Sequence, residues 1–297
     1  MTIDWERLKT VRFNHSELIS IAVGAENHFY FAVQARFITR IYKTFQFQCS
    51  IAYFFVIFSI KFFMRNREPF DLQRPLNAWN LVLAVFSSAG AIFMAPDFFG
   101  VLWRSGFRAS YCELDGMFEG LNGWWMWIFV LSKLTEFTDT LFIVLRKKPL
   151  LFLHWYHHIL TLIYSVYTYS SSTAFNRYLT YLNLVVHSAM YSYYFLRSIR
   201  VPIPGAIAKA ITTSQILQAI RLAVSGQSIF VQFVISIVVL VLCGVEYYLL
   251  ESQSDCAIDI RSFWFASIMD LSYLVLFFNF FLNAYVVKGG KDKYKKV

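Results

Sequence analysis

The sequence has 297 residues, of which 58% are hydrophobic, 20% aromatic and only 15% charged, and its formal net charge is +9. Soluble domains carry about 25% charged residues, so this composition excludes a water-soluble fold as well as a disordered, collagen-like or disulfide-dense secreted chain. It predicts an all-α integral membrane protein, whose positive charge reflects loop topology rather than nucleic-acid binding.

Seven apolar stretches are long enough to cross a membrane, since each span needs about 20 mostly apolar residues. They divide the chain into an N-terminal luminal segment (1–43), a transmembrane region (44–287) and a Lys-rich cytosolic tail (288–297). We expect about seven helices in a bundle or a helical barrel. The predicted spans are 44–64, 77–97, 124–145, 151–171, 178–198, 204–225 and 262–287.

Two local signals flank the transmembrane region. The start of the chain lacks a cleavable signal pattern, because it carries charges and has no continuous apolar core, so the first span is expected to act as the insertion signal. Asn14 opens a glycosylation sequon with His15 and Ser16. The tail, with Lys293 and Lys295, resembles a dilysine retrieval signal of the endoplasmic reticulum, and a stop-transfer anchor is the alternative.

Lysine and arginine are distributed unevenly between the predicted loops, with fifteen in one set and four in the other. Because cytosolic loops are enriched in these residues, we expect the first set to be cytosolic. The N-terminus is then luminal and the C-terminus cytosolic. The basic set is 61–74, 146–148, 197–209 and 288–296, and the other is 97–123, 171–177 and 251–261.

The third predicted span contains charged residues within an apolar run. Lys133, Glu136 and Asp139 follow one another at steps of three residues, and Thr140 comes next. Residues three or four apart on a helix are neighbours, so Lys133 can pair with Glu136. One interpretation is a salt bridge that neutralises buried charge, and the other is a functional site. Asp139 lies about 120° around the helix from Lys133, so the motif is expected to serve both.

Histidines are concentrated in the fourth and fifth predicted spans, which hold four of the six in the chain. His154, His157 and His158 have the i, i+3, i+4 spacing that places side chains on one face of a helix. We expect them to converge at the cytosolic end of the fourth span. An interfacial cluster of amphipathic side chains is the alternative, but ionisable groups inside membranes are costly and usually functional.

The fifth predicted span adds a second polar group at helical spacing. Asn183 precedes His187 by four residues and can orient it from one turn away, and Met190 and Tyr191 follow. A satisfied core histidine is the alternative interpretation of His187. The three other histidines nearby favour a functional one.

The sixth predicted span lies in a long stretch, residues 203–250, that contains only three charged groups. One helix of that length would be about 72 Å long, against about 30 Å of hydrocarbon. We therefore expect one span over 204–225 and a luminal re-entrant or interfacial helix over 226–250. Gln215 and Gln218 form a polar stripe in the span, for which helix–helix hydrogen bonding is the alternative.

Two of the four cysteines fall in predicted luminal loops. These are Cys112 and Cys256, whereas Cys49 and Cys243 fall in apolar runs. Four cysteines allow three pairings, and an oxidising lumen would permit a Cys112–Cys256 disulfide. This pairing depends on the predicted topology.

Four ordered motifs in consecutive spans resemble the very-long-chain fatty acid elongases, the condensing enzymes of microsomal chain elongation. The resemblance extends from about Arg74 to Tyr285, and it is most similar to the branch that acts on saturated acyl chains of palmitate length or shorter. The stretch 226–250 is longer than the family pattern. The motifs are Lys133-x-x-Glu136-x-x-Asp139-Thr140, His154-Trp155-Tyr156-His157-His158, Asn183-x-x-x-His187-x-x-Met190-Tyr191 and Thr212-x-x-Gln215-x-x-Gln218.

The resemblance implies a reaction in which an acyl-CoA and malonyl-CoA condense to a 3-ketoacyl-CoA, with release of CO2 and CoA. It implies a protein of the endoplasmic reticulum membrane with no cofactor and no metal. The acyl tail would lie in an apolar tunnel that runs toward the lumen between the spans. Reductase and dehydratase enzymes of the cycle, and a second copy of the chain, are candidate partners.

The condensation needs a nucleophile, and neither membrane cysteine lies beside the histidine cluster in sequence. A neutral imidazole is therefore the candidate, and the resemblance also favours His157, the middle histidine. Its attack on the thioester would give an acyl-imidazole, which the enolate from malonyl-CoA would then attack.

The remaining polar residues are expected to support this step. His154, His158 and His187 would tune the nucleophile, Asn183 would fix His187, and Gln215 or Gln218 would donate to the developing oxyanion. Lys133 would offset substrate charge or only pair with Glu136. A basic rim suits the CoA phosphates, and positive-inside topology is its alternative. The rim consists of Arg146, Lys147, Lys148, Arg197 and Arg200.

Two other classes of protein have matching features. Membrane desaturases and hydroxylases use histidine boxes to hold two iron atoms, which by that resemblance needs about eight histidines, and only four are available here. A single metal on the four histidines is not excluded. A proton-coupled transporter could also bury such polar groups, but no repeat relates the polar motifs of the two halves.

Overall fold

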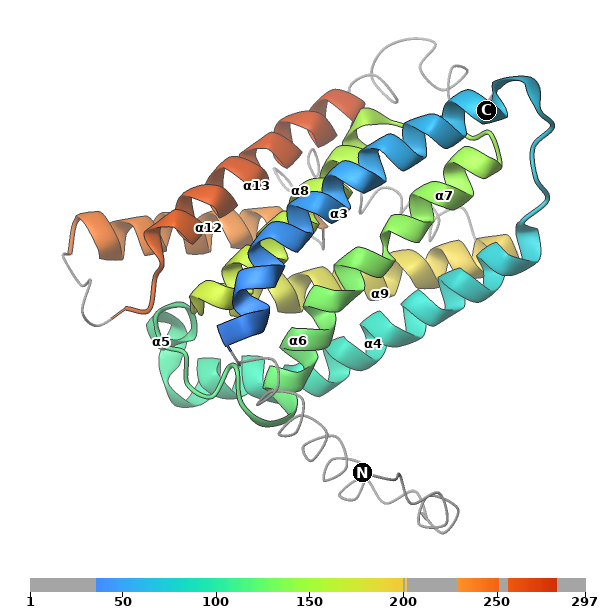
Figure 1. Ribbon diagram of the computed structural model, residues 1–297. Coiled ribbons are helices and arrows are strands. Elements are labelled where there is room, and N and C mark those ends of the chain that lie inside the picture. The colour runs from blue at the N-terminus through green and yellow to red at the C-terminus, as the bar shows by residue number, and fades with distance from the viewer. Residues whose placement is uncertain (1–35, 200, 202–228, 251–255, 282–297) are drawn as a thin grey trace, which may run out of the picture.

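The structure is a computed structural model that describes residues 36–199, 201, 229–250 and 256–281. Every element in these ranges is helical (Figure 1), which confirms the predicted all-α class. Several predicted features lie outside the described residues, so nothing is said of their structure: Asn14, the span 204–225 with Thr212, Gln215 and Gln218, Arg200, and the Lys-rich tail 288–297.

Helices α8 and α9 match their predicted spans to within two residues, whereas α3 begins eight residues earlier and α4 ends seven residues later than predicted. Three described helices are long and apolar enough to cross a membrane by length and composition alone, within Thr44–Asn66, Gln73–Arg104 and Ile260–Asn279. The elements are α3 (Arg36–Phe63), η1 (Met64–Asn66), α4 (Gln73–Arg104), α5 (Gly106–Cys112), α6 (Gly120–Thr135), α7 (Phe137–Leu145), α8 (Phe152–Ser171), α9 (Asn176–Ser198), α12 (Ile229–Tyr248) and α13 (Ile260–Phe281).

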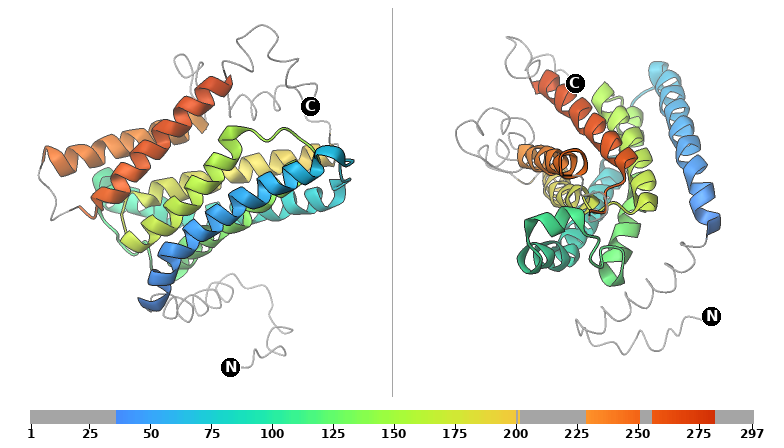
Figure 2. Two further views of the ribbon diagram at one scale, coloured as in Figure 1. Left: turned by 45° about the horizontal axis from the view of Figure 1, so that its top comes forward. Right: turned by 90° about the vertical axis from the view of Figure 1, so that its left-hand side faces the viewer.

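Helices α4 and α9 form the most extensive helix pair in the described structure and lie side by side in both views of Figure 2. Gly90 permits this approach, because a Cβ atom there would lie 3.0 Å from the side chain of Leu184. The hydroxyl groups of Ser88 and Ser188 meet across the same interface at 3.1 Å. Small residues at such contacts are typical of helix pairs in membranes, where close packing replaces the hydrophobic effect.

The third predicted span is divided at Glu136 into α6 and α7, which run end to end (Figure 1). The Ser132 hydroxyl donates to the carbonyl of Phe129, and the Thr135 hydroxyl donates to the carbonyl of Ser132. Side-chain bonds of this kind compete with the helix ladder and bend helices. The bend lies at the residue that carries the buried carboxylate of the polar motif.

Helix α3 packs on the outside of α7 and α8. The ring of Tyr53 stacks on Phe137 with centroids 4.0 Å apart. Trp155 of α8 makes edge contacts with Phe54 and Phe58 of α3, at 5.5 and 5.8 Å between centroids. The tryptophan of the histidine motif therefore faces α3.

The stretch 226–250 contains a regular helix, and its expected re-entrant or interfacial placement in the membrane stays a prediction. Helix α12 is a continuous helix of 20 residues, so it is about 30 Å long, which equals the thickness of the hydrocarbon core. It packs against α9 and α13, and its C-terminal end reaches α5. Ser225, Gly226 and Ser228 directly precede α12, whereas the run 229–245 contains no proline and no charged residue.

The end of the bundle at α5, which we call the disulfide end, is held by covalent and ionic links. Cys112 and Cys256 form a disulfide between segments 144 residues apart. Arg177 is buried, pairs with Asp97 and donates to three backbone carbonyls of the segment 110–114. A buried guanidinium requires this full set of partners.

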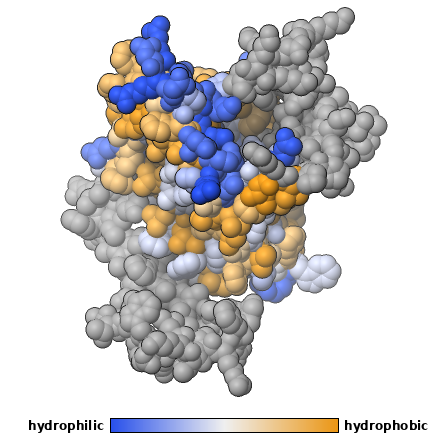
Figure 3. All heavy atoms as spheres, turned by 90° about the vertical axis from the view of Figure 1, so that its right-hand side faces the viewer, coloured by the Kyte–Doolittle hydropathy of each residue, from blue (hydrophilic) through white to orange (hydrophobic). Residues whose placement is uncertain are grey.

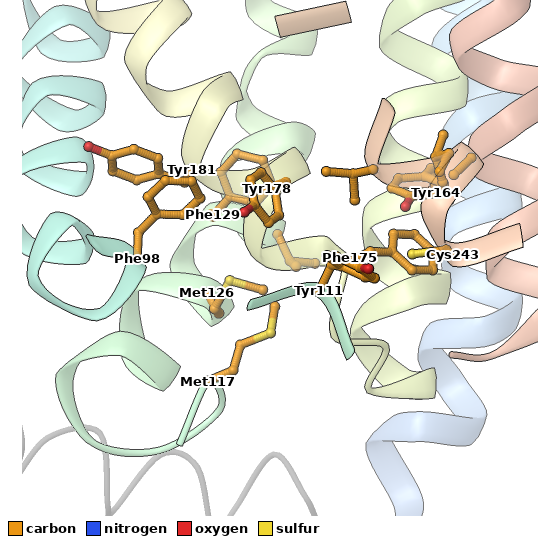
Figure 4. Packing of buried hydrophobic residues seen from close by; sticks show 14 of the residues in the cluster. Phe98, Tyr111, Met117, Met126, Phe129, Tyr164, Phe175, Tyr178, Tyr181 and Cys243 are labelled. Carbon is orange, nitrogen blue, oxygen red and sulfur yellow. The ribbon is translucent and has the colours of Figure 1, made fainter. Parts of the chain in front are cut away.

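A second ion pair closes the same end, between Arg108 of α5 and Glu246 of α12, with both carboxylate oxygens engaged at 2.8 and 2.9 Å. Burial raises the pKa of Tyr111, whose hydroxyl lies near Glu246. Aromatic and sulfur-containing side chains fill the space between these links (Figure 4), so this end is a packed core. The labelled core residues include Phe98, Met117, Met126, Phe129, Phe175 and Tyr178.

Candidate active site

A cavity of about 980 Å³ lies inside the bundle. Its wall is formed by residues of α4, α6, α7, α8, α9, α12 and α13, and no described residue of α3 lines it. These helices therefore enclose it as a barrel, with α3 outside. Along α9 the lining extends from Asn176 to Ser198, which is about 33 Å of helix. His187 lies near the midpoint of that length.

The three histidines of α8 lie together on the cavity wall. The ring centroids of His154 and His158 are 4.5 Å apart, and those of His157 and His158 are 5.5 Å apart. The Nε2 atom of His154 lies 2.9 Å from the Thr140 hydroxyl, which also bonds to the hydroxyl of Tyr53 at 2.6 Å. His154 is thus anchored by α7 and α3.

His157 differs from its neighbours in what engages its ring. Its imidazole contacts the ring of Tyr273 at 5.1 Å between centroids, and the Tyr273 hydroxyl donates to its backbone carbonyl. No hydrogen bond from the described residues engages the imidazole of His157 itself. Of the four histidines, it is therefore one with its ring nitrogens available to a ligand in the cavity.

His187 of α9 lies on the same wall and is held by a buried network. Its Nε2 is 3.4 Å from the Asn183 amide, and its Nδ1 is 3.8 Å from Glu136. The Lys133 ammonium donates to Glu136 at 2.7 Å and to the Asn183 side-chain oxygen at 2.9 Å. Lys133 and Glu136 are 2% and 3% exposed and do not line the cavity. Their place behind His187 suits positioning of that ring.

Asp139 and Tyr191 also lie on the cavity wall. The Asp139 carboxylate accepts from the Tyr191 hydroxyl at 2.6 Å and from the Trp79 indole at 2.5 Å. It therefore ties α7 to α9 and α4 at the site. Trp79 was not identified from the sequence, because a tryptophan in an apolar span has no spacing signal that separates it from the core.

The end of the cavity that lies away from the disulfide end, which we call the basic end, is lined by Arg146, Lys148 and Arg197. Figure 3 shows hydrophilic side chains gathered on this end of the molecule. Lys147 does not line the cavity, and its ammonium donates to the carbonyls of Arg65 and Arg67. The structure thus divides the predicted basic rim into residues that line the opening and one that holds the neighbouring loop.

The other end of the cavity extends to Thr168, Tyr169 and Asn176, against the core of the disulfide end. Along α8, Thr168 is 11 residues beyond His157, or about 16.5 Å. An extended chain advances about 1.2 Å per bond, so this depth holds about 14 carbon–carbon bonds. The length corresponds to a palmitoyl chain to within about two carbons.

Gln232 of α12 lines the cavity, although no sequence motif singled it out. A Cβ atom on Gly244 would lie 3.3 Å from Phe263, which sets the register of α12 against α13. Gln232 lies about 18 Å from Gly244 along the axis of α12, and Tyr273 lies about 15 Å from Phe263 along the axis of α13. Gln232 therefore lies near the level of Tyr273 and the histidines. As one of the few polar residues in the run 229–245, it could have been singled out from the sequence.

Within the part of the chain that the structure describes, no group of three or more His, Cys, Asp or Glu side chains is arranged to hold a metal ion. The described histidines instead contact one another, hydroxyl groups and the Lys133 network.

Comparisons with known proteins agree with the predicted resemblance. The family model described as ELO, the GNS1/SUR4 family, matches residues 41–293. Long chain fatty acid elongase 1 of Caenorhabditis elegans is 47% identical over 292 residues, which cover 98% of this chain and 96% of the relative. Very long chain fatty acid elongase 6 is 40% identical over 248 residues in Drosophila melanogaster (82% and 72% covered) and 38% identical over 250 residues in Homo sapiens (84% and 86% covered).

Proposed function

We propose that this chain, which belongs to the ELO (GNS1/SUR4) family and is a fatty acid elongase, condenses a long-chain acyl-CoA with malonyl-CoA to give a 3-ketoacyl-CoA, CO2 and CoA. The observation that carries this proposal is one cavity that connects a basic opening, four histidines and an apolar channel. Cationic side chains suit the phosphates of CoA, and the channel suits an acyl chain.

The nucleophile in this proposal is His157. Its ring faces the cavity without a hydrogen bond from the described residues, as does that of His158, whereas His154 and His187 are engaged by Thr140 and by Asn183. The motif resemblance favours His157, the middle histidine, over His158. A neutral imidazole attacks carbonyl carbon through its unprotonated nitrogen, and a desolvated site favours the neutral form.

The reaction proceeds in two balanced steps. In the first, a His157 ring nitrogen bonds to the acyl carbon, the carbon–sulfur bond breaks, and the imidazole proton leaves with the sulfur as CoA thiol. In the second, malonyl-CoA loses CO2 to form an enolate, whose carbon attacks the acyl-imidazole. The carbon–nitrogen bond then breaks and the imidazole regains a proton. Hydrogen-bond donors at the histidine level, such as the Gln232 amide, would stabilise the oxyanion.

Acyl chains of about palmitate length are the proposed substrates, because the channel beyond His157 holds about 14 bonds. The thioester would lie at the histidines and the CoA arm would leave through the basic end. We propose that no resident cofactor or metal takes part. Other enzymes of the elongation cycle and a second copy of the chain remain proposed partners.

The proposed setting is the endoplasmic reticulum membrane, with the basic end cytosolic and the disulfide end luminal. Arg146, Lys148 and Arg197 at one end and the Cys112–Cys256 disulfide at the other support this orientation. Acyl-CoA would then enter from the cytosol, where the Lys-rich tail is also expected.

The test is intact-protein mass spectrometry after incubation of the purified chain with palmitoyl-CoA alone, beside a His157→Ala variant. Peptide mapping follows under conditions that preserve acyl-imidazoles. We expect one palmitoyl adduct on His157 that malonyl-CoA discharges as 3-ketoacyl-CoA, and no adduct on the variant.

A chelator arm separates the histidine-box alternative from this mechanism. Elongation that persists with the chelator and an adduct that forms as expected support the imidazole route. Activity without any adduct, abolished by the chelator, would overturn the nucleophile and indicate a metal-assisted reaction.

A further inference from the structure

One acidic side chain on the cavity wall has no part in the mechanism described above. Asp270 of α13 lines the cavity and is 5% exposed. Its Oδ2 atom is buried and has no hydrogen-bond partner among the residues that the structure describes. The carboxyl group lies close enough to the hydroxyls of Tyr164 and Tyr273 to interact with them electrostatically.

The other polar groups around it are satisfied within the protein. Ser165 and Thr168 donate to carbonyls of their own helix, Leu162 and Tyr164 respectively. The Tyr164 hydroxyl donates to Asn176 at 2.8 Å. These bonds engage the polar groups of α8 nearest to Asp270, whereas the Oδ2 atom of Asp270 has no such bond from the described residues.

The neighbouring tyrosine cannot serve Asp270 without losing its own contacts. The Tyr273 hydroxyl lies 3.1 Å from Thr161 and donates to the His157 carbonyl at 3.1 Å. A buried polar atom that lacks a partner is costly. A plain alkyl chain beside Asp270 would leave that cost in place, whereas a chain with a hydrogen-bond donor would remove it.

We propose that Asp270 makes the channel selective for acyl chains that carry a hydroxyl group, which donates to the free carboxyl oxygen. This inference rests on the proposed function, since it places an acyl chain in the channel. It names the substrate class more narrowly, as mid-chain hydroxylated acyl-CoA.

The position of Asp270 along the channel sets the position of the hydroxyl. Asp270 is three residues before Tyr273, or about 4.5 Å closer to the disulfide end. Tyr273 lies at the level of His157, where the thioester carbon would be. At about 1.2 Å per bond, this offset is about four bonds, so the carboxyl faces the chain at about the fifth to the sixth carbon.

The experiment compares kcat/KM for palmitoyl-CoA with that for palmitoyl-CoA hydroxylated at the sixth, the eighth or the terminal carbon. Wild type, Asp270→Leu and Asp270→Asn are assayed, with Ser267→Leu as a matched polar-to-Leu change on the same helix, away from the cavity. A site built to bond a hydroxyl rejects the analogue that lacks it, whereas an apolar site discriminates weakly.

We expect wild type and Ser267→Leu to favour a mid-chain hydroxyl over palmitoyl-CoA by at least about tenfold. Asp270→Leu is expected to lose this preference and to elongate palmitoyl-CoA at least as well as wild type, while Asp270→Asn keeps part of it. The proposal would be overturned if Asp270→Leu left the ratio of kcat/KM for mid-chain hydroxylated to plain palmitoyl-CoA unchanged. It would also be overturned if a terminal hydroxyl raised kcat/KM as much as a mid-chain hydroxyl.

Thermal stabilisation by each acyl-CoA, measured without malonyl-CoA, gives a readout that needs no turnover. If no acyl-CoA is elongated but the hydroxylated chain still stabilises wild type more than Asp270→Leu, the proposed condensation fails and the binding site stands. If elongation proceeds but neither assay shows a preference for the hydroxylated chain, the proposed condensation stands and the hydroxyl site at Asp270 fails.

Discussion

At the scale of single residues, the buried ammonium of Lys133 is paired within its own helix to Glu136 and across to Asn183 of α9. The spacing of Lys133 and Glu136 predicted their pairing, because i and i+3 on one helix are neighbours. The contact of Lys133 with Asn183 joins two helices, and no local spacing encodes such a contact. The same reasoning explains why Asp139 was identified while its partner Trp79 was not.

Removal of one partner from the Lys133–Glu136 pair should destabilise the protein strongly. Glu136→Gln leaves a buried ammonium without its carboxylate, at a cost of about 3–5 kcal/mol. We expect this loss in the free energy of unfolding in detergent, measured by denaturant titration. The double variant Lys133→Met with Glu136→Leu should lose less, because it buries no lone charge. An equal or larger loss in the double variant would contradict this account.

The basic end offers a matched pair of lysines that are adjacent in sequence. Lys148 lines the opening, whereas Lys147 bonds to loop carbonyls. One lost contact to a phosphate is worth about 1.4 kcal/mol or more. Lys148→Gln should therefore raise KM for acyl-CoA about tenfold with kcat little changed, and Lys147→Gln should leave KM within about twofold. Steady-state kinetics at fixed ionic strength would measure both, and equal effects would favour a purely topological role for these charges.

At the scale of helices, segments bounded by charges or turn residues were predictable and the long apolar run was not. The ends of α8 and α9 lie within two residues of the predicted spans, because charged clusters flank them. Gly226 and Ser228 precede α12, but they do not indicate how the helix that follows them is placed in the membrane. Helix α12 begins where tertiary contacts with α9 and α13 stabilise it, and hydropathy does not report those contacts.

Helix α12 gives a test of which glutamine serves the reaction. Gln232 lines the cavity at the level of the histidines, and loss of one oxyanion donor costs about 100-fold or more in kcat. We expect Gln232→Leu to show such a loss with KM little changed. Gln215→Leu and Gln218→Leu are the controls, and each should retain kcat within about fivefold. If one of these loses more than Gln232→Leu, the assignment from the sequence motif stands.

At the scale of the whole molecule, the barrel holds the histidines halfway along a channel. This channel is closed at the disulfide end. Along α9, His187 is about 15 Å from Arg197 and about 16.5 Å from Asn176. The disulfide, the buried Arg177 and the aromatic core hold the closed end. The fixed distance from the histidines to the closed end should therefore limit the length of the acyl chain. No single motif in the sequence encodes this distance.

A ladder of blocking substitutions along α8 tests this limit. Ser165 and Thr168 line the channel, with Ser165 about 4.5 Å closer to the histidines. Ser165→Phe should shorten the longest accepted acyl chain by about four carbons more than Thr168→Phe, at about 1.2 Å per bond. Product lengths from a series of acyl-CoA substrates, measured by mass spectrometry, would show the steps. Ser170→Phe, on an exposed position of the same helix, is the control and should leave the limit unchanged. A uniform loss of activity at every chain length in both channel variants would mean that the substitutions disturb packing. Channel depth would then not be what limits acyl-chain length.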